Sequence, residues 1–344
     1  MIPRRVKMAV AAVGGVVAIV VALYAIGVIG VPTATVADPG DWESVDENET
    51  EVVTTVTVNN PNPLGIGLGR AVVVDYDLQL NNVVVAEGRT TNLSAPPGES
   101  TATVRTDIQN AKLAPWWRSF VRENETVRIG VDATVEIDAG ISAEQSVSFG
   151  PRVELDNRTP VIDGLSRAAN RTEGTYGVNT PTGTVGYEIE RAWATWGPVN
   201  ESRTTVRYHY VIRNPNRVPI PAVPDGFSVE LIANDVGLLQ GDASAISPRT
   251  VGRDETIPPR ETQTVVFDVA MDNDRIDDWF RSHVRRDELT TMESRMRLLF
   301  EVAGRQIRVP QDGPSTYACD VQTAILVDNE TSDTTCASTV GGTE

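Results

Sequence analysis

The sequence contains few of the residues that enzymes commonly place at reactive centres. Two histidines, His209 and His283, and two cysteines, Cys319 and Cys336, occur in 344 residues. A structural metal site needs about four grouped ligands, and the sequence groups none. No nucleophile elbow is present, and isolated histidines are more often structural or surface residues. We therefore predict no catalytic residues, no metal, no cofactor and no enzymatic activity.

Lysine is also scarce. Two of the 30 basic residues are lysine, and 47 acidic residues bring the formal net charge to -17. A surface this acidic excludes general attraction to nucleic acid. Abundant carboxylates with almost no lysine resemble proteins of extreme halophiles such as halophilic archaea. Such acidity describes a solvated surface rather than a binding site.

One long apolar run stands at the amino-terminal end. Residues 1–7 carry a basic cluster, and the uncharged residues 8–31 would span about 36 Å as a helix, enough for a bilayer core of about 30 Å. We predict a single-pass membrane anchor with residues 1–7 in the cytoplasm and residues 32–344 outside the cell. A signal peptide cleaved near residues 35–37 is the alternative.

Two further features agree with an exterior location. The cysteines Cys319 and Cys336 can close a disulfide in an oxidising environment, with two free thiols as the alternative. Seven Asn-x-Ser/Thr sequons are candidate glycosylation sites. These sequons lie at Asn48, Asn92, Asn124, Asn157, Asn170, Asn200 and Asn329.

The chain contains an internal repeat. The stretch 54–63 alternates apolar and polar residues and then ends in Asn-Pro-Asn-Pro, and residues 208–216 repeat this pattern with an offset of 154 residues. The same offset places Trp42 on Trp196 without a gap. Period-2 alternation predicts a half-buried strand, and proline ends its hydrogen bonding. A repeat this long indicates two copies of one domain.

Each copy continues with a predicted hairpin and a double proline. Asn81-Asn82 and Asn234-Asp235 supply the turns between alternating strands. Pro96-Pro97 and Pro258-Pro259 each precede a further strand. Between the motif and the first hairpin, residues 64–70 read as a glycine-rich loop, because no helix follows as a dinucleotide fingerprint requires.

Each copy then changes to helical periodicity once. Apolar residues recur at helical spacing in 113–121 and 276–284, and both segments contain tryptophan on the apolar face. We predict one amphipathic helix per copy, packed on the core. Asp272 and Asp274 precede the second helix, and capping is a better reading of them than calcium binding.

These features divide the chain into six parts. The predicted parts are a cytoplasmic terminus 1–7, an anchor 8–31, a first domain 33–150, a linker 151–184, a second domain 185–310 and a tail 311–344 with a strand at 323–327.

The order of these elements resembles the late-embryogenesis-abundant type 2 family, whose unit is the water-stress-and-hypersensitive-response (WHy) domain. The motif residues that carry the resemblance are Asn60, Pro61, Asn62, Pro63, Asn214, Pro215 and Asn216. The resemblance implies a mainly β protein with two tandem antiparallel β-sandwiches, similar to fibronectin type III domains. The second copy departs from the first at Arg217, where the first has Pro63.

The resemblance implies a role in desiccation and salt stress without catalysis. We expect a membrane-anchored protective protein whose partners are the membrane itself and either labile client proteins or envelope proteins, with no nucleic acid. A cell-envelope adhesion or structural module is the alternative, because fold does not decide function.

Overall fold

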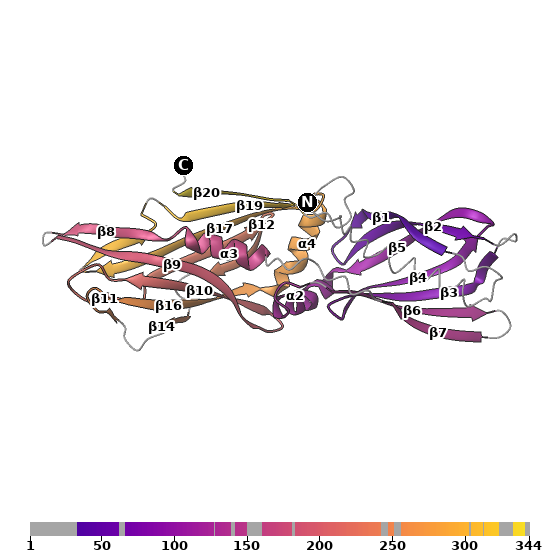
Figure 1. Cartoon of the computed structure of the whole chain (residues 1–344), viewed down its shortest axis with the longest axis horizontal. Coiled ribbons are helices and arrows are strands. Elements are labelled where there is room, and N and C mark those ends of the chain that lie inside the picture. Colours follow the sequence, from indigo (N-terminus) through magenta and orange to yellow (C-terminus); the bar gives the residue numbers. More distant parts are fainter. Residues whose placement is uncertain are drawn as a thin grey trace.

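The computed structural model shows an elongated molecule in which two β-rich units lie end to end (Figure 1). We call residues 33–149 the first unit and residues 160–340 the second unit. The structure describes residues 33–61, 66–126, 128–138, 142–149, 160–180, 183–241, 247–250, 256–302, 304–311, 313–322 and 333–340.

Strands dominate both units. The first unit contains β1 (Thr33–Val45), β2 (Glu49–Asn60), β3 (Ile66–Leu80), β4 (Val83–Ala95), β5 (Gly98–Gln109), the 3-10 turn η1 (Asn110–Lys112), α2 (Leu113–Arg122), β6 (Ile129–Asp138) and β7 (Ser142–Phe149). The second unit begins with α3 (Pro160–Asn170), β8 (Gly174–Thr180), β9 (Gly183–Val199), β10 (Arg203–Arg213), β11 (Ile220–Pro221), β12 (Gly226–Ala233), β13 (Val236–Gly241) and β14 (Ser247–Thr250). It continues with β15 (Thr256–Ile257), β16 (Thr262–Asp272), the 3-10 turn η2 (Asn273–Arg275), α4 (Ile276–Val284), β17 (Leu289–Val302), β18 (Arg305–Val309), β19 (Ser315–Gln322) and β20 (Asp333–Val340). The prediction of a mainly β protein is confirmed.

Neighbouring strands in both units pair antiparallel. The first unit has the strand order β1-β2-β5-β4-β3-β6-β7, and the second has β20-β19-β17-β12-β13-β16-β10-β9-β8, with β14 and β18 attached at the side. Each order contains one weak link. β4 and β5 pair at Ala86–Ile108 and Glu87–Asp107, and β13 pairs with β16 at Leu239–Met271. Each sheet therefore consists of two halves joined by a short stretch of pairing.

Side chains from the two halves meet in the core of the second unit. The Phe227 ring of β12 stacks on Phe267 of β16 with 5.0 Å between centroids. Tyr187 of β9 stacks on Phe300 of β17 at 4.0 Å. All four rings are buried. Burial of aromatic area of this size supplies a large share of a domain's stability, so these contacts hold the halves together.

A tyrosine links the halves of the first unit. Tyr76 of β3 passes over Gly88 of β4, and its hydroxyl lies 2.7 Å from the hydroxyl of Thr106 on β5. A Cβ at Gly88 would lie 2.0 Å from Cζ of Tyr76, so any larger residue would displace the ring.

The repeated strand forms as its periodicity predicts. In β10, Val206, Tyr208, Tyr210 and Ile212 are all fully buried, and the residues between them are half-buried. The two predicted hairpins are also confirmed. Their turn residues Asn81-Asn82 and Asn234-Asp235 have positive φ angles between 48° and 67°, which the type I′ turn requires.

The two predicted amphipathic helices are α2 and α4, which lie between the two units (Figure 1). The buried residues of α2 include Leu113 and Trp117, and those of α4 include Ile276 and His283. The Asp272 carboxylate accepts a hydrogen bond from the Asp274 N–H at 3.0 Å and so caps the 3-10 turn η2 that leads into α4. The N-cap residue of α4 itself is Arg275, which makes no side-chain capping bond.

Three regions differ from the sequence prediction. Part of the glycine-rich stretch 64–70 belongs to β3, whose pairing with β4 is irregular between Gly67 and Val73. The stretch 151–184, predicted as a linker, contains α3 and β8, which pack and pair against β9. The tail contributes β19 and β20 to the second sheet, whereas the strand predicted at 323–327 lies outside the described residues.

The predicted anchor 8–31 also lies outside the described residues. Among the helices that the structure describes, none combines the length and apolar character needed to cross a bilayer.

Candidate functional site

The Asn-Pro-Asn motif of the second unit forms a corner at the end of β10. The Asn214 side chain is completely buried. Its Nδ2 donates to the carbonyl oxygens of Val218 at 2.8 Å, Ile257 at 2.8 Å and Pro258 at 3.1 Å. Its Oδ1 accepts from the N–H of Asn216 at 2.8 Å. One side chain therefore joins the end of β10 to the chain after the motif and to the double-proline segment.

Asn216 continues the corner to the neighbouring strand. Its Oδ1 accepts from the N–H of Gly186 at 3.0 Å, and its Nδ2 donates to the Gly186 carbonyl oxygen at 2.7 Å. This pair of bonds imitates the bonding of a strand residue with β9. The same Nδ2 also donates to Oδ1 of Asn214 at 2.7 Å.

The corner of the first unit is described in part. Asn60 is buried at the end of β2 and lies opposite Gly98 at the start of β5. Pro61 is exposed, whereas Asn62 and Pro63 lie outside the described residues.

The side-chain polar atoms of Asn214 and Asn216 are all engaged inside the protein. A ligand would have to displace bonds that satisfy buried carbonyl and N–H groups, at a cost of about 1–3 kcal/mol for each group left unpaired. The corner is therefore a structural element, and it explains why both asparagines accompany the proline.

The two histidines lie on different elements, His209 on β10 and His283 on α4. His209 stacks on Trp193 with 4.7 Å between ring centroids, and its Nε2 lies 2.9 Å from the Thr195 hydroxyl. Burial, followed by the nearby Arg207, lowers the pKa of His209. His283 is buried on α4, and its Nδ1 lies 2.8 Å from the Thr290 hydroxyl. Burial lowers the pKa of His283 to about 4. Each ring therefore has a threonine hydroxyl as a described hydrogen-bond partner.

Potential metal ligands are also scattered. Among the described residues, no group of three or more His, Cys, Asp or Glu side chains could hold a metal ion.

The cysteines lie on the last two strands. Cys319 of β19 is disulfide-bonded, and its register partner on β20 is Cys336, the other cysteine of the sequence. A disulfide between these two strands would hold the edge strand β20 on the sheet.

Four of the predicted glycosylation sequons lie at exposed positions. These are Asn48, Asn124, Asn170 and Asn200. Asn92 lies on β4 with its side chain outside the description, and Asn157 and Asn329 lie outside the described residues. Thr50 of the first sequon is buried and donates to Oδ1 of Asn110 at 2.9 Å. A glycan on Asn48 would therefore have to be attached before that hydroxyl is buried.

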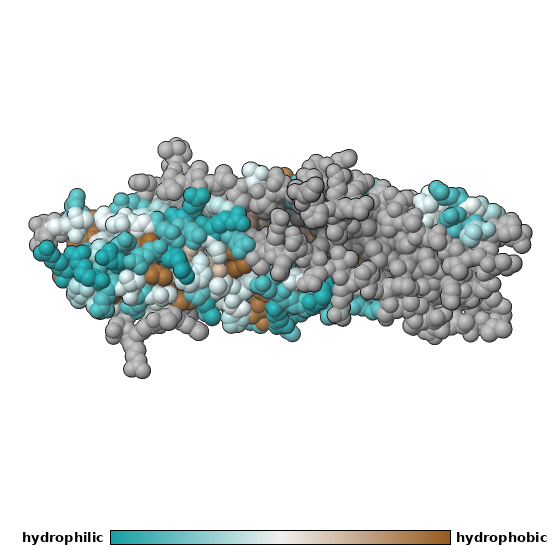
Figure 2. Space-filling model, viewed as in Figure 1, coloured by the Kyte–Doolittle hydropathy of each residue, from teal (hydrophilic) through white to brown (hydrophobic). Residues whose placement is uncertain are grey.

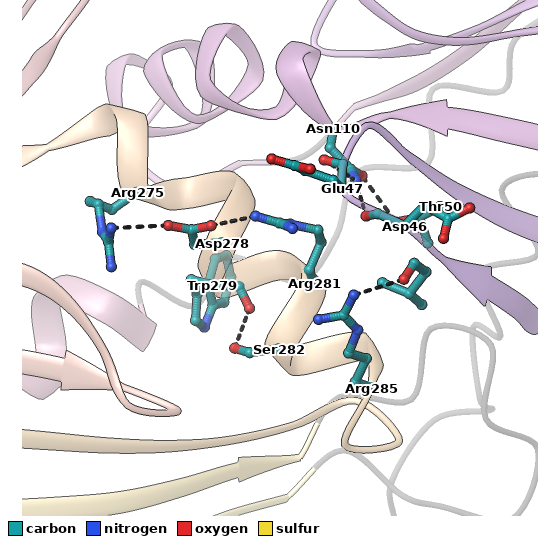
Figure 3. Close-up of polar contacts among 11 residues, drawn as sticks. Asp46, Glu47, Thr50, Asn110, Arg275, Asp278, Trp279, Arg281, Ser282 and Arg285 are labelled. Atoms are coloured by element: carbon teal, nitrogen blue, oxygen red, sulfur yellow. Dashed lines mark hydrogen bonds and ion pairs between the residues drawn. The ribbon is translucent and has the colours of Figure 1, made fainter.

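Sequence reasoning missed a set of buried polar residues that both units share. Thr50 donates to Asn110, and at equivalent positions Thr204 donates to Oδ1 of Asn273 at 2.6 Å. Each asparagine also donates to carbonyl oxygens of the preceding strand-to-strand turn, such as that of Asp46 at 3.1 Å in the first unit (Figure 3). Asn110 and Asn273 differ by 163 residues, the offset that relates the two helices, so the repeat alignment contained the signal.

The turn residue Glu125 was also missed. Its carboxylate is buried and accepts from the N–H groups of Val161 and Ile162 and from Nε1 of Trp196, each at 2.9 Å. Burial raises the pKa of Glu125, and these hydrogen bonds oppose the shift. The carboxylate satisfies free N–H groups in the first turn of α3 and favourably places negative charge at that helix end.

The described surface of the second unit is mainly polar in the view of Figure 2, with small separate apolar areas. Val218, at 52% exposure, is the one exposed large hydrophobic residue in the part of the chain described.

Comparison with solved structures gives weak likenesses. A crystal structure of a protein from Archaeoglobus fulgidus is 20% identical with a TM-score of 0.30, and the alignment covers 39% of this chain and 94% of that one. A β-glucuronidase of glycoside hydrolase family 2 is 9% identical with a TM-score of 0.22, over 82% of this chain and 25% of that one. The exo-chitosanase CsxA of Amycolatopsis orientalis is 9% identical with a TM-score of 0.18, over 76% and 25%. We base no conclusion on scores this low.

Comparison of the sequence with known families is more informative. No curated protein matches the chain. One family model does match, over residues 55–157, and its description is late embryogenesis abundant protein. That range contains most of the first unit, including the end of β2, the first hairpin and α2. The match supports assignment of residues 55–157 to the late embryogenesis abundant proteins of the LEA_2 type.

Proposed function

We propose that this chain is a non-enzymatic stress-protection protein, active against desiccation and salt stress outside the cell membrane. The observation that carries the proposal is the LEA_2 family match over residues 55–157. The repetition of the buried Thr–Asn contact in the second unit extends the proposal to a second unit of the same WHy type.

We further propose that each unit is a β-sandwich similar to a fibronectin type III domain. The weak pairing between the halves of each sheet and the ring contacts between the halves of the second unit support this arrangement. The apolar run 8–31 and the basic residues before it support a membrane anchor with the units outside.

The physical mechanism depends on a hydrated surface. Carboxylates in excess over basic groups, with any attached glycans, hold water and ions near the membrane. The folded units keep partly unfolded neighbours apart without burying an extensive interface. The activity then needs no cofactor and no particular histidine.

A role as an envelope spacer is the second candidate. The end-to-end arrangement of the two units favours it, because such a shape holds an attached surface at a distance (Figure 1).

We expect the protein to preserve the activity of a labile enzyme through drying and freeze–thaw cycles. The test adds residues 33–344 to the enzyme and compares the recovered activity with that given by an equal mass of an inert acidic protein. Equal recovery in both samples, together with unchanged desiccation survival of a deletion strain, would contradict protection. The spacer role would then be favoured.

We expect protease added to intact cells to release fragments of residues 32–344. Mass spectrometry of the released peptides checks both the topology and the occupancy of the sequons. Fragments that appear after cell lysis but not before it would place these residues on the cytoplasmic side of the membrane and contradict the prediction.

We expect stability to rise with salt. Repulsion among the excess carboxylates extends over a Debye length of about 30 Å at 0.01 M salt and about 3 Å at 1 M. The melting temperature of residues 33–344 should therefore increase between these concentrations. A constant or falling melting temperature would contradict adaptation of this chain to high salt.

A further inference from the structure

The two units contact each other through reciprocal pairs of residues. Positions in β1 and β2 correspond to positions in β9 and β10 with an offset of 154, and positions in and after α2 correspond to those in and after α4 with an offset of 163. Three contacts between the two units occur twice under these offsets, once in each direction. We call the region formed by these contacts the joint.

The first reciprocal pair joins a tryptophan to a buried carboxylate. Trp196 of the second unit donates from Nε1 to Oε1 of Glu125 in the first unit at 2.9 Å. Trp42 of the first unit donates from Nε1 to Oε1 of Glu288 in the second unit at 3.0 Å. Both carboxylates are buried, and both glutamates have positive φ angles of about 60°. The same unusual backbone turn therefore presents each carboxylate.

The second reciprocal pair joins an arginine to a carbonyl oxygen. Arg122 at the end of α2 donates to the carbonyl oxygen of Val199 on β9 at 2.9 Å. Arg285, which follows α4, donates to the carbonyl oxygen of Val45 on β1 at 2.8 Å. Figure 3 shows Arg285 reaching from α4 toward the first unit.

The third reciprocal pair is aromatic. Trp117 of α2 meets the edge of Trp196 with 6.0 Å between centroids and 87° between planes. Phe280 of α4 meets Trp42 with 5.9 Å and 82°. Near-perpendicular rings at these distances attract each other beyond their burial. Trp117 also lies 6.4 Å from Trp279, so the two helices touch each other.

Contacts that repeat in both directions define an isologous interface. In such an interface residue i of one unit meets residue j of the other, and j of the first meets i of the second. Symmetric homodimers have this property because both partners offer the same surface. Here the two partners are successive units of one chain.

We propose that the helix face of each unit is a self-recognising surface, whose partner is a copy of the same unit. In the closed chain that partner is the sister unit. When one face is lost, the other face binds the corresponding face of a second copy of this chain.

Two copies of the second unit would retain the donors and acceptors of the first two reciprocal pairs. They would lose the hydrogen bond from Nε1 of Trp117 to the Thr204 hydroxyl at 3.2 Å, because Phe280 stands at the equivalent position of α4. Trp196 of each copy would face Glu288 of the other, and Arg285 would face the carbonyl oxygen of Val199. Trp196 would also meet Phe280 at the edge. The three reciprocal pairs therefore do not require the first unit.

The closed form is favoured in the intact chain. Covalent connection gives each face an effective concentration of its sister unit in the millimolar range. Association of two chains should therefore become visible only when one face is destroyed.

The experiment uses the full chain in detergent and destroys one face at a time. Glu125→Arg places a cation opposite the N–H groups of Trp196, Val161 and Ile162, and thereby frees the face of the second unit. Glu288→Arg does the same from the other side. We expect the wild type to be a monomer and each single variant to double its protein mass at high concentration, as measured by light scattering. The double variant should be a monomer, because neither face remains.

Two measurements keep the test decisive. A red shift of tryptophan emission reports opening of the joint around Trp117, and circular dichroism reports whether the strands remain folded. The milder variants Trp42→Ala and Trp196→Ala replace any arginine variant that unfolds. Exposed Glu99→Arg, in β5, is the matched control and should stay a closed monomer.

Single variants that open but stay monomeric would overturn self-recognition. Single variants that stay closed would show that these carboxylates do not hold the joint. A dimeric double variant would show that association uses another surface.

Discussion

Replacing Asn214 by alanine should lower the free energy of unfolding of the second unit by about 3–5 kcal/mol. The side chain is fully buried and donates to three carbonyl oxygens, of Val218, Ile257 and Pro258. Alanine leaves these groups and the N–H of Asn216 without their partner. Each buried group left unpaired costs about 1–3 kcal/mol, and water entering the space would recover part of the loss. Urea unfolding of residues 33–344, followed by tryptophan fluorescence, measures the change.

Two matched variants separate the hydrogen bonds from a general effect of substitution. Asn179 on β8 is exposed, so Asn179→Ala should change stability by less than about 0.5 kcal/mol. Asn214→Asp keeps one acceptor but turns the donor into an oxygen that faces three carbonyl oxygens. It should cost at least as much as alanine. A loss below about 1 kcal/mol in Asn214→Ala, or a tolerated aspartate, would show that the corner does not depend on this side chain.

The elements that the sequence predicted well are those defined by local patterns. Alternation over residues 206–212 identified the buried face of β10, and turn residues such as Asn81-Asn82 identified the hairpins. Helical spacing identified α2 and α4. In each case one stretch of chain contains the whole signal, because the period of the side chains follows from backbone geometry.

The elements that were missed depend on residues distant in sequence. Helix α3 lies in a stretch with little periodicity, and its first turn is capped by the Glu125 carboxylate, which precedes it by more than 30 residues. The irregular start of β3 owes its strand conformation to pairing with β4 rather than to its own glycines. The composition of such a segment alone predicts a loop, because the residues that order the segment lie elsewhere in the sequence.

The corner motif shows how far local reasoning extends into a site. Proline after Asn214 predicted the end of the strand, which the structure confirms. The role of Asn216 was out of reach, because its partner Gly186 precedes it by 30 residues. The reciprocal joint is different. Its residues follow the two repeat offsets. The first offset already places Trp42 on Trp196, and the second would have shown that Glu125 matches Glu288.

The two copies are most alike where polar groups are buried. Thr–Asn pairs, hairpin asparagines and turn glutamates recur in both copies. Some aromatic positions of the helices carry different residues, such as Phe120 in the first copy and His283 in the second. A buried apolar side chain can be replaced by another of similar volume at small cost. A buried hydrogen-bonding group cannot lose its partner so easily.

Because His283 replaces the phenylalanine of the first copy, the stability of the second unit should depend on the protonation of this residue. Burial lowers the pKa of His283 to about 4, although the carboxylate of Glu288 acts in the opposite direction. The folded unit therefore binds this proton less readily than the unfolded chain, whose histidine has an ordinary pKa of about 6.5. Its contribution to stability is complete above pH 6.5 and decreases as the pH falls toward 4. At about 1.4 kcal/mol per pH unit, the loss between pH 7 and pH 4.5 should be about 2–3 kcal/mol.

His283→Phe should remove this loss, and the first unit shows why the variant should fold. Phe120 occupies the equivalent buried position on α2. Without the imidazole, the Thr290 hydroxyl still accepts a hydrogen bond from Nε1 of Trp279 at 3.1 Å, so it keeps a hydrogen-bond partner. Acid also relieves repulsion among surface carboxylates, and this effect is common to both proteins and cancels in the comparison. We expect the wild type to lose about 2–3 kcal/mol more than the variant in urea unfolding between pH 7 and pH 4.5. Parallel pH profiles would mean that His283 has the same pKa in the folded unit as in the unfolded chain, with the Glu288 carboxylate offsetting the effect of burial.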